Sequence, residues 1–65
     1  MNHTDTVYAL TYLPATDLNF KSELARATGL QIAMAVEVMK NRDGKDKGRI
    51  AACERELKRR AKVSR

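Results

Sequence analysis

The chain has 65 residues, and its 13 lysines and arginines outweigh 8 aspartates and glutamates to give a net charge of +5. A chain this short forms one domain, here residues 1–65, and buries only about 60% of its unfolded surface, so an isolated monomer is marginally stable. We expect neither an enzyme nor a cofactor, because little chain is left to enclose a pocket once a core is filled. The single cysteine excludes an internal disulfide and a Cys/His zinc site, so no metal is expected. The chain shows neither an apolar run of about 20 residues nor an export signal, which predicts no membrane contact and a cytoplasmic location.

The positive charge lies at one end of the chain. Residues 40–65 contain 11 basic and 4 acidic residues, whereas residues 1–39 contain 2 basic and 4 acidic residues. Such asymmetry is typical of proteins that bind a polyanion, most often nucleic acid, although a solvated helix and a basic tail would give the same pattern.

Residues 6–13, TVYALTYL, are rich in β-branched and aromatic side chains and end at a proline. This composition predicts a strand, with Tyr8 and Tyr12 on one face and cross-strand packing as their expected role. A strand needs a pairing partner, in this chain or in a second copy. We expect residues 1–5 and 64–65 to fray.

A turn follows, and then a helix from about Leu18 to Thr28. Thr16 or Asp17 is the expected N-cap of this helix. Gly29 suits a helix end or a tight turn. The buried face is expected at positions spaced i, i+4 and i+7, which are Phe20, Leu24 and Ala27.

Residues 30–39, LQIAMAVEVM, fit two structures. Alanine and methionine favour a helix, which would be apolar nearly all round and therefore buried on most sides. The valines and the alternation of large with small or polar residues favour a strand. We favour the helix; in the alternative this segment pairs with residues 6–13.

The last segment is the clearest helix in the sequence. After a loop over residues 41–47, NRDGKDK, it runs from about Gly48 to Val63. An apolar stripe is expected at Ile50, Cys53, Leu57 and Ala61, where the cysteine acts as a small buried hydrophobe. The opposite face is basic and holds Arg55, Lys58, Arg59 and Lys62.

These elements predict a mainly α fold. It has a short N-terminal strand, an αα corner of the helix-turn-helix kind and a basic amphipathic C-terminal helix. The alternative is an α+β fold with the order β-α-β-α.

Residues 23–41, ELARATGLQIAMAVEVMKN, resemble the helix-turn-helix of bacterial and phage transcription regulators. In that family an apolar residue and an alanine, here Leu24 and Ala25, pack the first helix against the second. A glycine at the turn, here Gly29, is followed by an apolar residue, here Leu30. The resemblance implies a second helix lying in the DNA major groove. Core positions of that second helix would fall on Ala35 and Val38.

Other families share shorter matches. Leu13-Pro14 and Ala27-Thr28-Gly29 look like the strand-to-helix passage of ribbon-helix-helix repressors, which are obligate dimers. The Ala-Thr-Gly-Leu of residues 27–30 is also similar to the carboxyl-terminal domain of the ribosomal stalk protein, and the region resembles the helical module of translation elongation factor Ts.

The helix-turn-helix resemblance also implies which residues meet DNA. Outward positions of the second helix would be Gln31, Ile32, Ala33, Val36, Glu37 and Lys40. Of these, Gln31 and Lys40 are the side chains suited to read base edges. Phosphate contacts are expected from the loop and the last helix. The candidate nucleic-acid-binding residues are therefore Gln31, Lys40, Arg42, Lys45, Lys47, Arg55, Lys58, Arg59 and Lys62.

We therefore expect a small, non-enzymatic regulator of the type found in phages and plasmids, which binds duplex DNA as a homodimer. No catalytic residue is expected, because His3 has no second ligand or nucleophile at a useful spacing. The alternative is a phage or plasmid protein that docks on a host protein as an adaptor or inhibitor, which the apolar residues 30–39 would favour.

Overall fold

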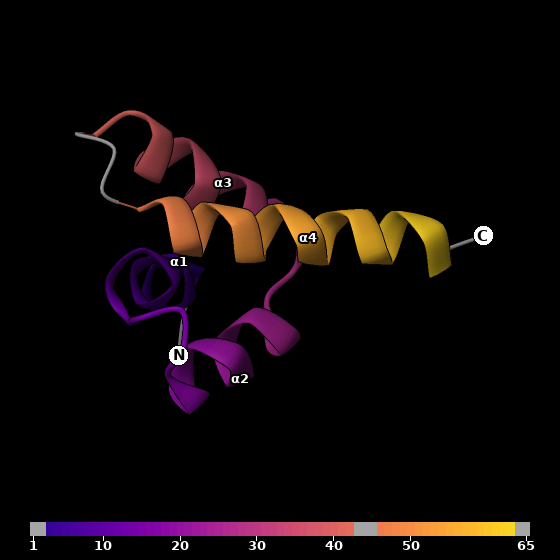
Figure 1. Ribbon diagram of the computed structural model, residues 1–65, viewed down its shortest axis with the longest axis horizontal. Coiled ribbons are helices and arrows are strands. Elements are labelled where there is room, and N and C mark those ends of the chain that lie inside the picture. The colour runs from indigo at the N-terminus through magenta and orange to yellow at the C-terminus, as the bar shows by residue number, and fades with distance from the viewer. Residues whose placement is uncertain (1–2, 43–45, 64–65) are drawn as a thin grey trace.

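The computed structural model describes residues 3–42 and 46–63. Within them the chain forms four helices and no strand: α1 (His3–Tyr12), α2 (Leu18–Arg26), α3 (Gly29–Lys40) and α4 (Lys47–Val63). Helix α1 packs on α3 and on α2, and α3 packs on α4 (Figure 1). The mainly α prediction is confirmed, whereas the β-α-β-α alternative is wrong.

The N-terminal strand expected over residues 6–13 is also wrong, because this segment belongs to α1. Leu10 and Thr11 are buried against the other helices, and the Thr11 hydroxyl donates to the Tyr8 carbonyl oxygen at 2.8 Å. Tyr8 and Tyr12 are exposed and stack one turn apart, with ring centroids 5.8 Å apart, instead of packing across strands. The preference of β-branched and aromatic residues for strands depends on context, and the apolar face that α1 presents to α3 outweighs it here.

Helix α2 begins where the sequence predicts. Asp17 is the N-cap, and its carboxylate accepts from the Asn19 backbone N–H at 2.7 Å. Phe20 is 1% exposed and fixes the buried face of the helix. The helix ends at Arg26, two residues before the expected end, because Ala27 adopts an extended backbone with ψ 146°.

The junction between α2 and α3 differs from the expected turn. Thr28 is the N-cap of α3 and forms a capping box with Gln31, with the two reciprocal hydrogen bonds at 2.8 and 3.1 Å. Gly29 is the first residue of α3, its φ is not positive, and a Cβ added there would meet nothing within 4 Å. The expectation that Gly29 ends a helix or forms a tight turn is therefore wrong.

Residues 30–39 are helical, so the favoured interpretation is confirmed and the strand alternative is wrong. The buried residues of α3 are Gln31, Ile32, Ala35, Val36 and Met39. Gln31, Ile32 and Val36 were expected to face outward, and Val38, expected in the core, is 46% exposed. The buried face is rotated because α3 packs on both α1 and α4. An exposed apolar row remains, the α3 stripe: Leu30, Met34 and Val38.

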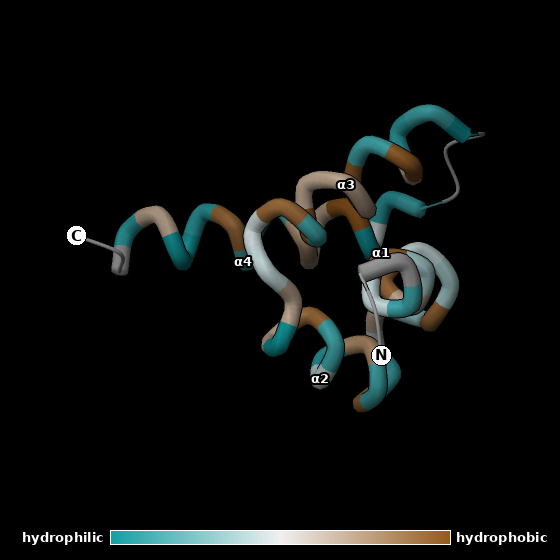
Figure 2. Tube along the Cα trace, turned by 180° about the vertical axis from the view of Figure 1, so that it is seen from behind, coloured by the Kyte–Doolittle hydropathy of each residue, from teal (hydrophilic) through white to brown (hydrophobic). Residues whose placement is uncertain are grey.

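The core draws on all of these helices. Its largest fully buried side chains are Leu10, Phe20, Ile32, Met39 and Cys53. On α4 the expected apolar stripe is buried at Cys53 and partly buried at Ile50 and Leu57, whereas Ala61 is exposed. Ala61 is exposed because the C-terminal end of α4 projects beyond the other helices, a feature visible from both sides (Figures 1 and 2).

Candidate functional site

Basic side chains gather on the outer face of α4. Arg55, Lys58, Arg59 and Lys62 recur at i, i+3, i+4 and i+7 and line a shallow hollow of about 240 Å³; we call them the α4 cationic cluster. All members are exposed, as predicted for this face. Like charges spaced three and four residues apart destabilise a helix. The spacing of these charges therefore does not stabilise α4.

Within the described residues, Arg55, Lys58 and Lys62 have no acidic partner. Arg59 does have one, because its guanidinium donates to the two Glu56 carboxylate oxygens at 2.7 and 3.1 Å. This ion pair raises the pKa of Arg59, so the side chain stays charged.

Glu56 links the cluster to the fold. Hydrogen bonds from Arg59 and then from Arg60 lower the pKa of Glu56 to about 2, so its carboxylate is ionised at neutral pH. Arg60 pairs with Glu56 at 2.8 Å and also donates to the Ala27 carbonyl oxygen at 2.7 Å and the Leu24 carbonyl oxygen at 3.0 Å. Arg60 therefore caps the C-terminal end of α2 from α4 and fixes how the two helices lie.

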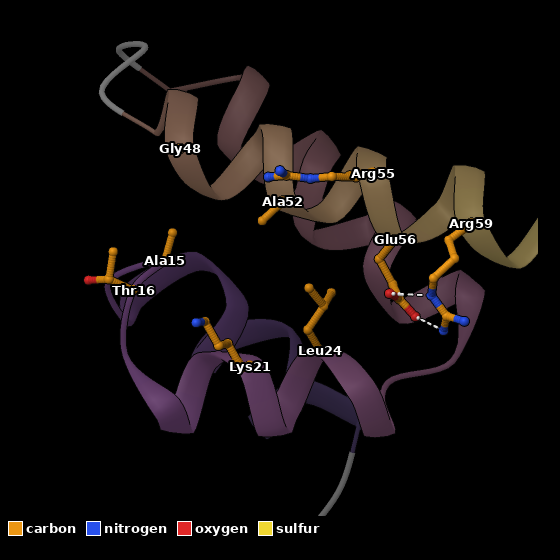
Figure 3. A pocket seen from close by; sticks show the side chains of 9 residues that line it. All are labelled: Ala15, Thr16, Lys21, Leu24, Gly48, Ala52, Arg55, Glu56 and Arg59. Carbon is orange, nitrogen blue, oxygen red and sulfur yellow. Dashed lines mark hydrogen bonds and ion pairs between the residues drawn. The ribbon is translucent and has the colours of Figure 1, made fainter.

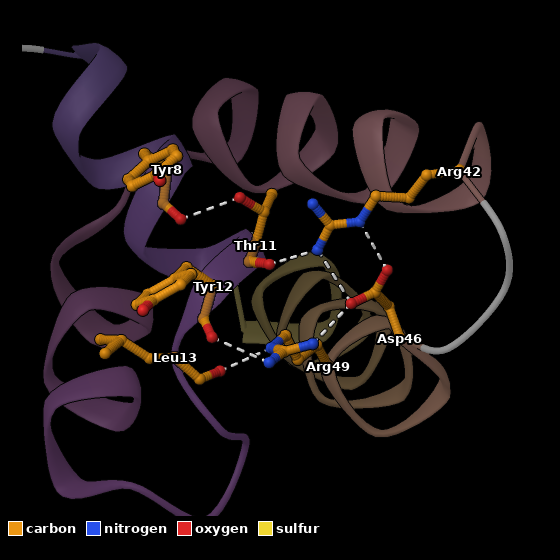
Figure 4. Close-up of polar contacts among 7 residues, drawn as sticks. All are labelled: Tyr8, Thr11, Tyr12, Leu13, Arg42, Asp46 and Arg49. Carbon is orange, nitrogen blue, oxygen red and sulfur yellow. Dashed lines mark hydrogen bonds and ion pairs between the residues drawn. The ribbon is translucent and has the colours of Figure 1, made fainter.

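A second arginine arrangement caps α1 (Figure 4). The Asp46 carboxylate, 4% exposed, accepts hydrogen bonds from Arg42 at 2.7 and 2.9 Å and from Arg49. Arg42 also donates to the Thr11 carbonyl oxygen, and Arg49 donates to the Leu13 carbonyl oxygen at 2.6 Å. The hydrogen bond from Arg42 is the main reason that the pKa of Asp46 lies below its usual range. We call Arg42, Asp46 and Arg49 the α1 clasp.

The structure therefore divides the predicted site residues. It brings together Arg55, Lys58, Arg59 and Lys62, while Arg42 belongs to the α1 clasp. Gln31 is 7% exposed and occupied by the capping box. Lys40 pairs with Glu54 at 3.0 Å and joins α3 to α4. Lys47 is exposed in the first turn of α4, about two turns before the cluster, and Lys45 lies outside the described residues.

The structural role of Arg49 and Arg60 was not predicted, although their spacing along the helix indicates it. At 100° per residue these two arginines lie within about 60° of arc together with Cys53 and Glu56, beside the apolar stripe and far from Arg55. This angular position on the helix predicts that both side chains face the other helices. What they bind was not predictable, because the carbonyl groups that accept from them lie more than 30 residues away in the chain.

We next consider whether the described residues could support nucleophilic or metal chemistry. Burial raises the pKa of the Cys53 thiol to about 11, so the thiolate needed for nucleophilic or metal chemistry is not formed near neutral pH. Across residues 3–42 and 46–63, His, Cys, Asp and Glu side chains form no group that could hold a metal ion. In the same part of the chain, no helix has the length and apolar character needed to cross a membrane.

No model of a known protein family matches the sequence, and neither the curated proteins nor the solved structures contain a significant match to this chain.

Proposed function

We propose that this protein is a small DNA-binding protein of the transcription-regulator type that acts without catalysis. The α4 cationic cluster carries the proposal: its side chains share one exposed face, and Arg55, Lys58 and Lys62 have no acidic partner among the described residues. Lysine and arginine on one face of a helix are suited to the phosphates of duplex DNA, which lie in rows along the groove edges.

In this proposal phosphate contacts dominate and base reading is minor. The side chains that would read bases from α3, Gln31 and Lys40, take part in the capping box and in the ion pair with Glu54. Phosphate contacts position a protein on DNA but carry no sequence information directly. We therefore expect affinities for different duplexes to differ little and to fall steeply with salt.

We also propose that the protein acts as a homodimer through the α3 stripe. Leu30 is 67% exposed, and Met34 and Val38 are each 46% exposed, so α3 presents an apolar row to solvent. Residues four apart form a ridge, and two such ridges interdigitate in the commonest mode of helix packing. A second copy would cover the row and add stability that a chain of 65 residues needs.

The helix-turn-helix interpretation remains part of this proposal in a reduced form. Helices α2 and α3 are consecutive and joined by Ala27 and Thr28, but Ala25, which the resemblance places between the two helices, is exposed. The glycine turn of that family is replaced here by the capping box of Thr28. We therefore assign DNA contact to α4 and a dimer contact to α3.

Fluorescence anisotropy with a labelled duplex tests the proposal. Three cluster side chains per subunit have no acidic partner among the described residues, so a plot of log K against log salt should have a slope of about −2.7 per bound subunit. The double variant Lys58→Ala/Lys62→Ala should reduce the slope by about 2 units. The matched control is Lys21→Ala/Lys47→Ala, which removes the same charge outside the cluster and should leave the slope unchanged. Equal effects of the two variants, or no binding at about 0.1 M salt, would refute the proposal.

A further inference from the structure

A groove lies between α2 and α4 (Figure 3), and it shares Arg55 and Arg59 with the hollow of the cationic cluster. It has a volume of about 650 Å³ and begins where the turn after α1 approaches the start of α4. Its floor is apolar and is formed by Ala15, Leu24 and Ala52. We call it the α2–α4 groove.

The walls of the groove are positively charged. Lys21 projects from α2 and Arg55 from α4, on opposite sides of the apolar floor (Figure 3). In the described part of the chain neither side chain has an acidic partner. Glu56 also lines the groove, but its carboxylate is occupied by Arg59 and Arg60. A ligand therefore meets two uncompensated positive charges with apolar surface between them.

The shape of the floor suits a helix. Gly48 and Ala52 lie one turn apart on α4, and a Cβ added to Gly48 would lie 3.8 Å from the Ala15 Cβ, so Gly48 and Ala15 close one end of the groove while the small Ala52 side chain leaves its floor low. The groove follows α4 from Gly48 to Arg59, a length of about 17 Å or three helical turns. Small residues let the ridge of a second helix approach closely.

We propose that the α2–α4 groove is the docking site for an acidic amphipathic helix of a partner protein. Apolar side chains at i, i+3, i+4 and i+7 would contact the floor, and carboxylates on both flanks would pair with Lys21 and Arg55. A nucleic acid backbone would leave the apolar floor without a partner, and so fits this groove less well than an amphipathic helix. Arg55 belongs to both the groove and the cationic cluster, whereas Lys21 and Ala52 lie in the groove alone, so a change at Lys21 tests this inference separately from DNA binding.

The probe for the test is a labelled synthetic peptide of about 14 residues, with leucines at helical spacing and glutamates on both flanks. A scrambled peptide of the same composition breaks the spacing and keeps the charge. We expect saturable binding of the probe by anisotropy and binding at least about tenfold weaker for the scrambled peptide. Amide shifts in nuclear magnetic resonance spectra should be largest at Ala15, Gly48 and Ala52. Equal binding of both peptides, or no saturation at about 1 mM, would overturn the proposal.

A matched pair of charge reversals locates the site. Lys21→Glu changes an exposed groove residue and should weaken probe binding about tenfold, whereas Lys58→Glu makes the same charge change outside the groove and should alter it less than about threefold. Circular dichroism checks that both variants are folded. Equal losses would mean that the net charge alone attracts the peptide, which contradicts a docking site.

Discussion

The arginines of α4 fall into two sets that the sequence presents as one basic helix. Arg49 and Arg60 turn inward and donate to carbonyl groups at the C-terminal ends of α1 and α2, respectively. Arg55, on the same helix, turns outward and has no acidic partner among the residues described. The comparison teaches that a cationic helix can stabilise the fold along one side while its other side keeps cations without an acidic partner among the described residues. Net charge alone therefore overstates the surface available to a polyanion.

The largest expected effect separates the two sets by stability. Arg49→Ala removes the hydrogen bonds to the Leu13 and Tyr12 carbonyl oxygens and takes one of two arginines from Asp46. We expect a loss of about 2 kcal/mol in the free energy of unfolding and a fall of about 10 °C in Tm. The control Arg55→Ala should change stability by less than about 0.5 kcal/mol. Thermal melts followed by circular dichroism measure both, and equal losses would contradict the comparison.

Acid should lower the free energy of unfolding, because it protonates the carboxylates that pair with Arg49 and Arg60. The pKa of Glu56 is lowered from 4.5 to about 2 in the folded protein, and that of Asp46 is also lowered. The unfolded chain therefore binds protons at a higher pH than the folded one, so stability is full above about pH 5 and falls as the pH approaches 2. Melting curves between pH 7 and pH 2 measure the decline. Glu56→Gln should make it shallower, and an unchanged pH dependence in that variant would contradict the role given to Glu56.

The sequence was sufficient to predict features that depend on contacts between residues close together in the chain. Asp17 is an N-cap because its carboxylate reaches the backbone N–H two residues on, and α4 has an amphipathic period that needs no other helix to explain it. The sequence was insufficient to predict features that depend on contacts between different helices. Residues 6–13 have strand composition but pack as a helix, and Val38 is exposed because α1 and α4 fix the phase of α3.

The candidate site divides in the same way. The members of the α4 cationic cluster follow from helical spacing alone. Arg42 was predicted to bind nucleic acid because its charge is evident from the sequence. The carbonyl group of α1 to which it donates lies 31 residues away in the chain, so this contact could not be predicted. Lys21, on the opposite wall of the α2–α4 groove, could not be associated with Arg55 without the packing of two separate helices.

A smaller expected effect, on ligand affinity, tests whether the outward-facing Arg55 contacts both DNA and the acidic peptide. Arg55 and Arg59 line both the cluster and the α2–α4 groove. We expect Arg55→Ala to weaken duplex DNA and the acidic peptide by about three- to tenfold each. Lys62→Ala should affect DNA alone, and Lys21→Glu should mainly affect the peptide. Anisotropy titrations of each ligand measure this pattern, and a peptide that fails to compete with DNA would show that the two surfaces are independent.

The smallest expected effect concerns the exposed start of α3. Gly29 has no positive φ and open space where a Cβ would lie. Gly29→Ala should therefore stabilise the protein by about 0.5 kcal/mol, because alanine favours a helix and restricts the unfolded chain. Denaturant titration measures the change. A clear destabilisation would indicate that this position needs the backbone freedom of glycine, as a helix-turn-helix turn would.

The α1 clasp has a consequence for biosynthesis. The last carbonyl groups of α1 are satisfied by side chains that follow them by 31 to 37 positions. During translation these side chains leave the ribosome later than the first helix does. A nascent chain that ends at Lys40 would also lack Cys53, a fully buried member of the core. The α1 clasp therefore cannot close until Arg49 has left the ribosome, so α1 gains its native contacts late and not as a helix that folds alone.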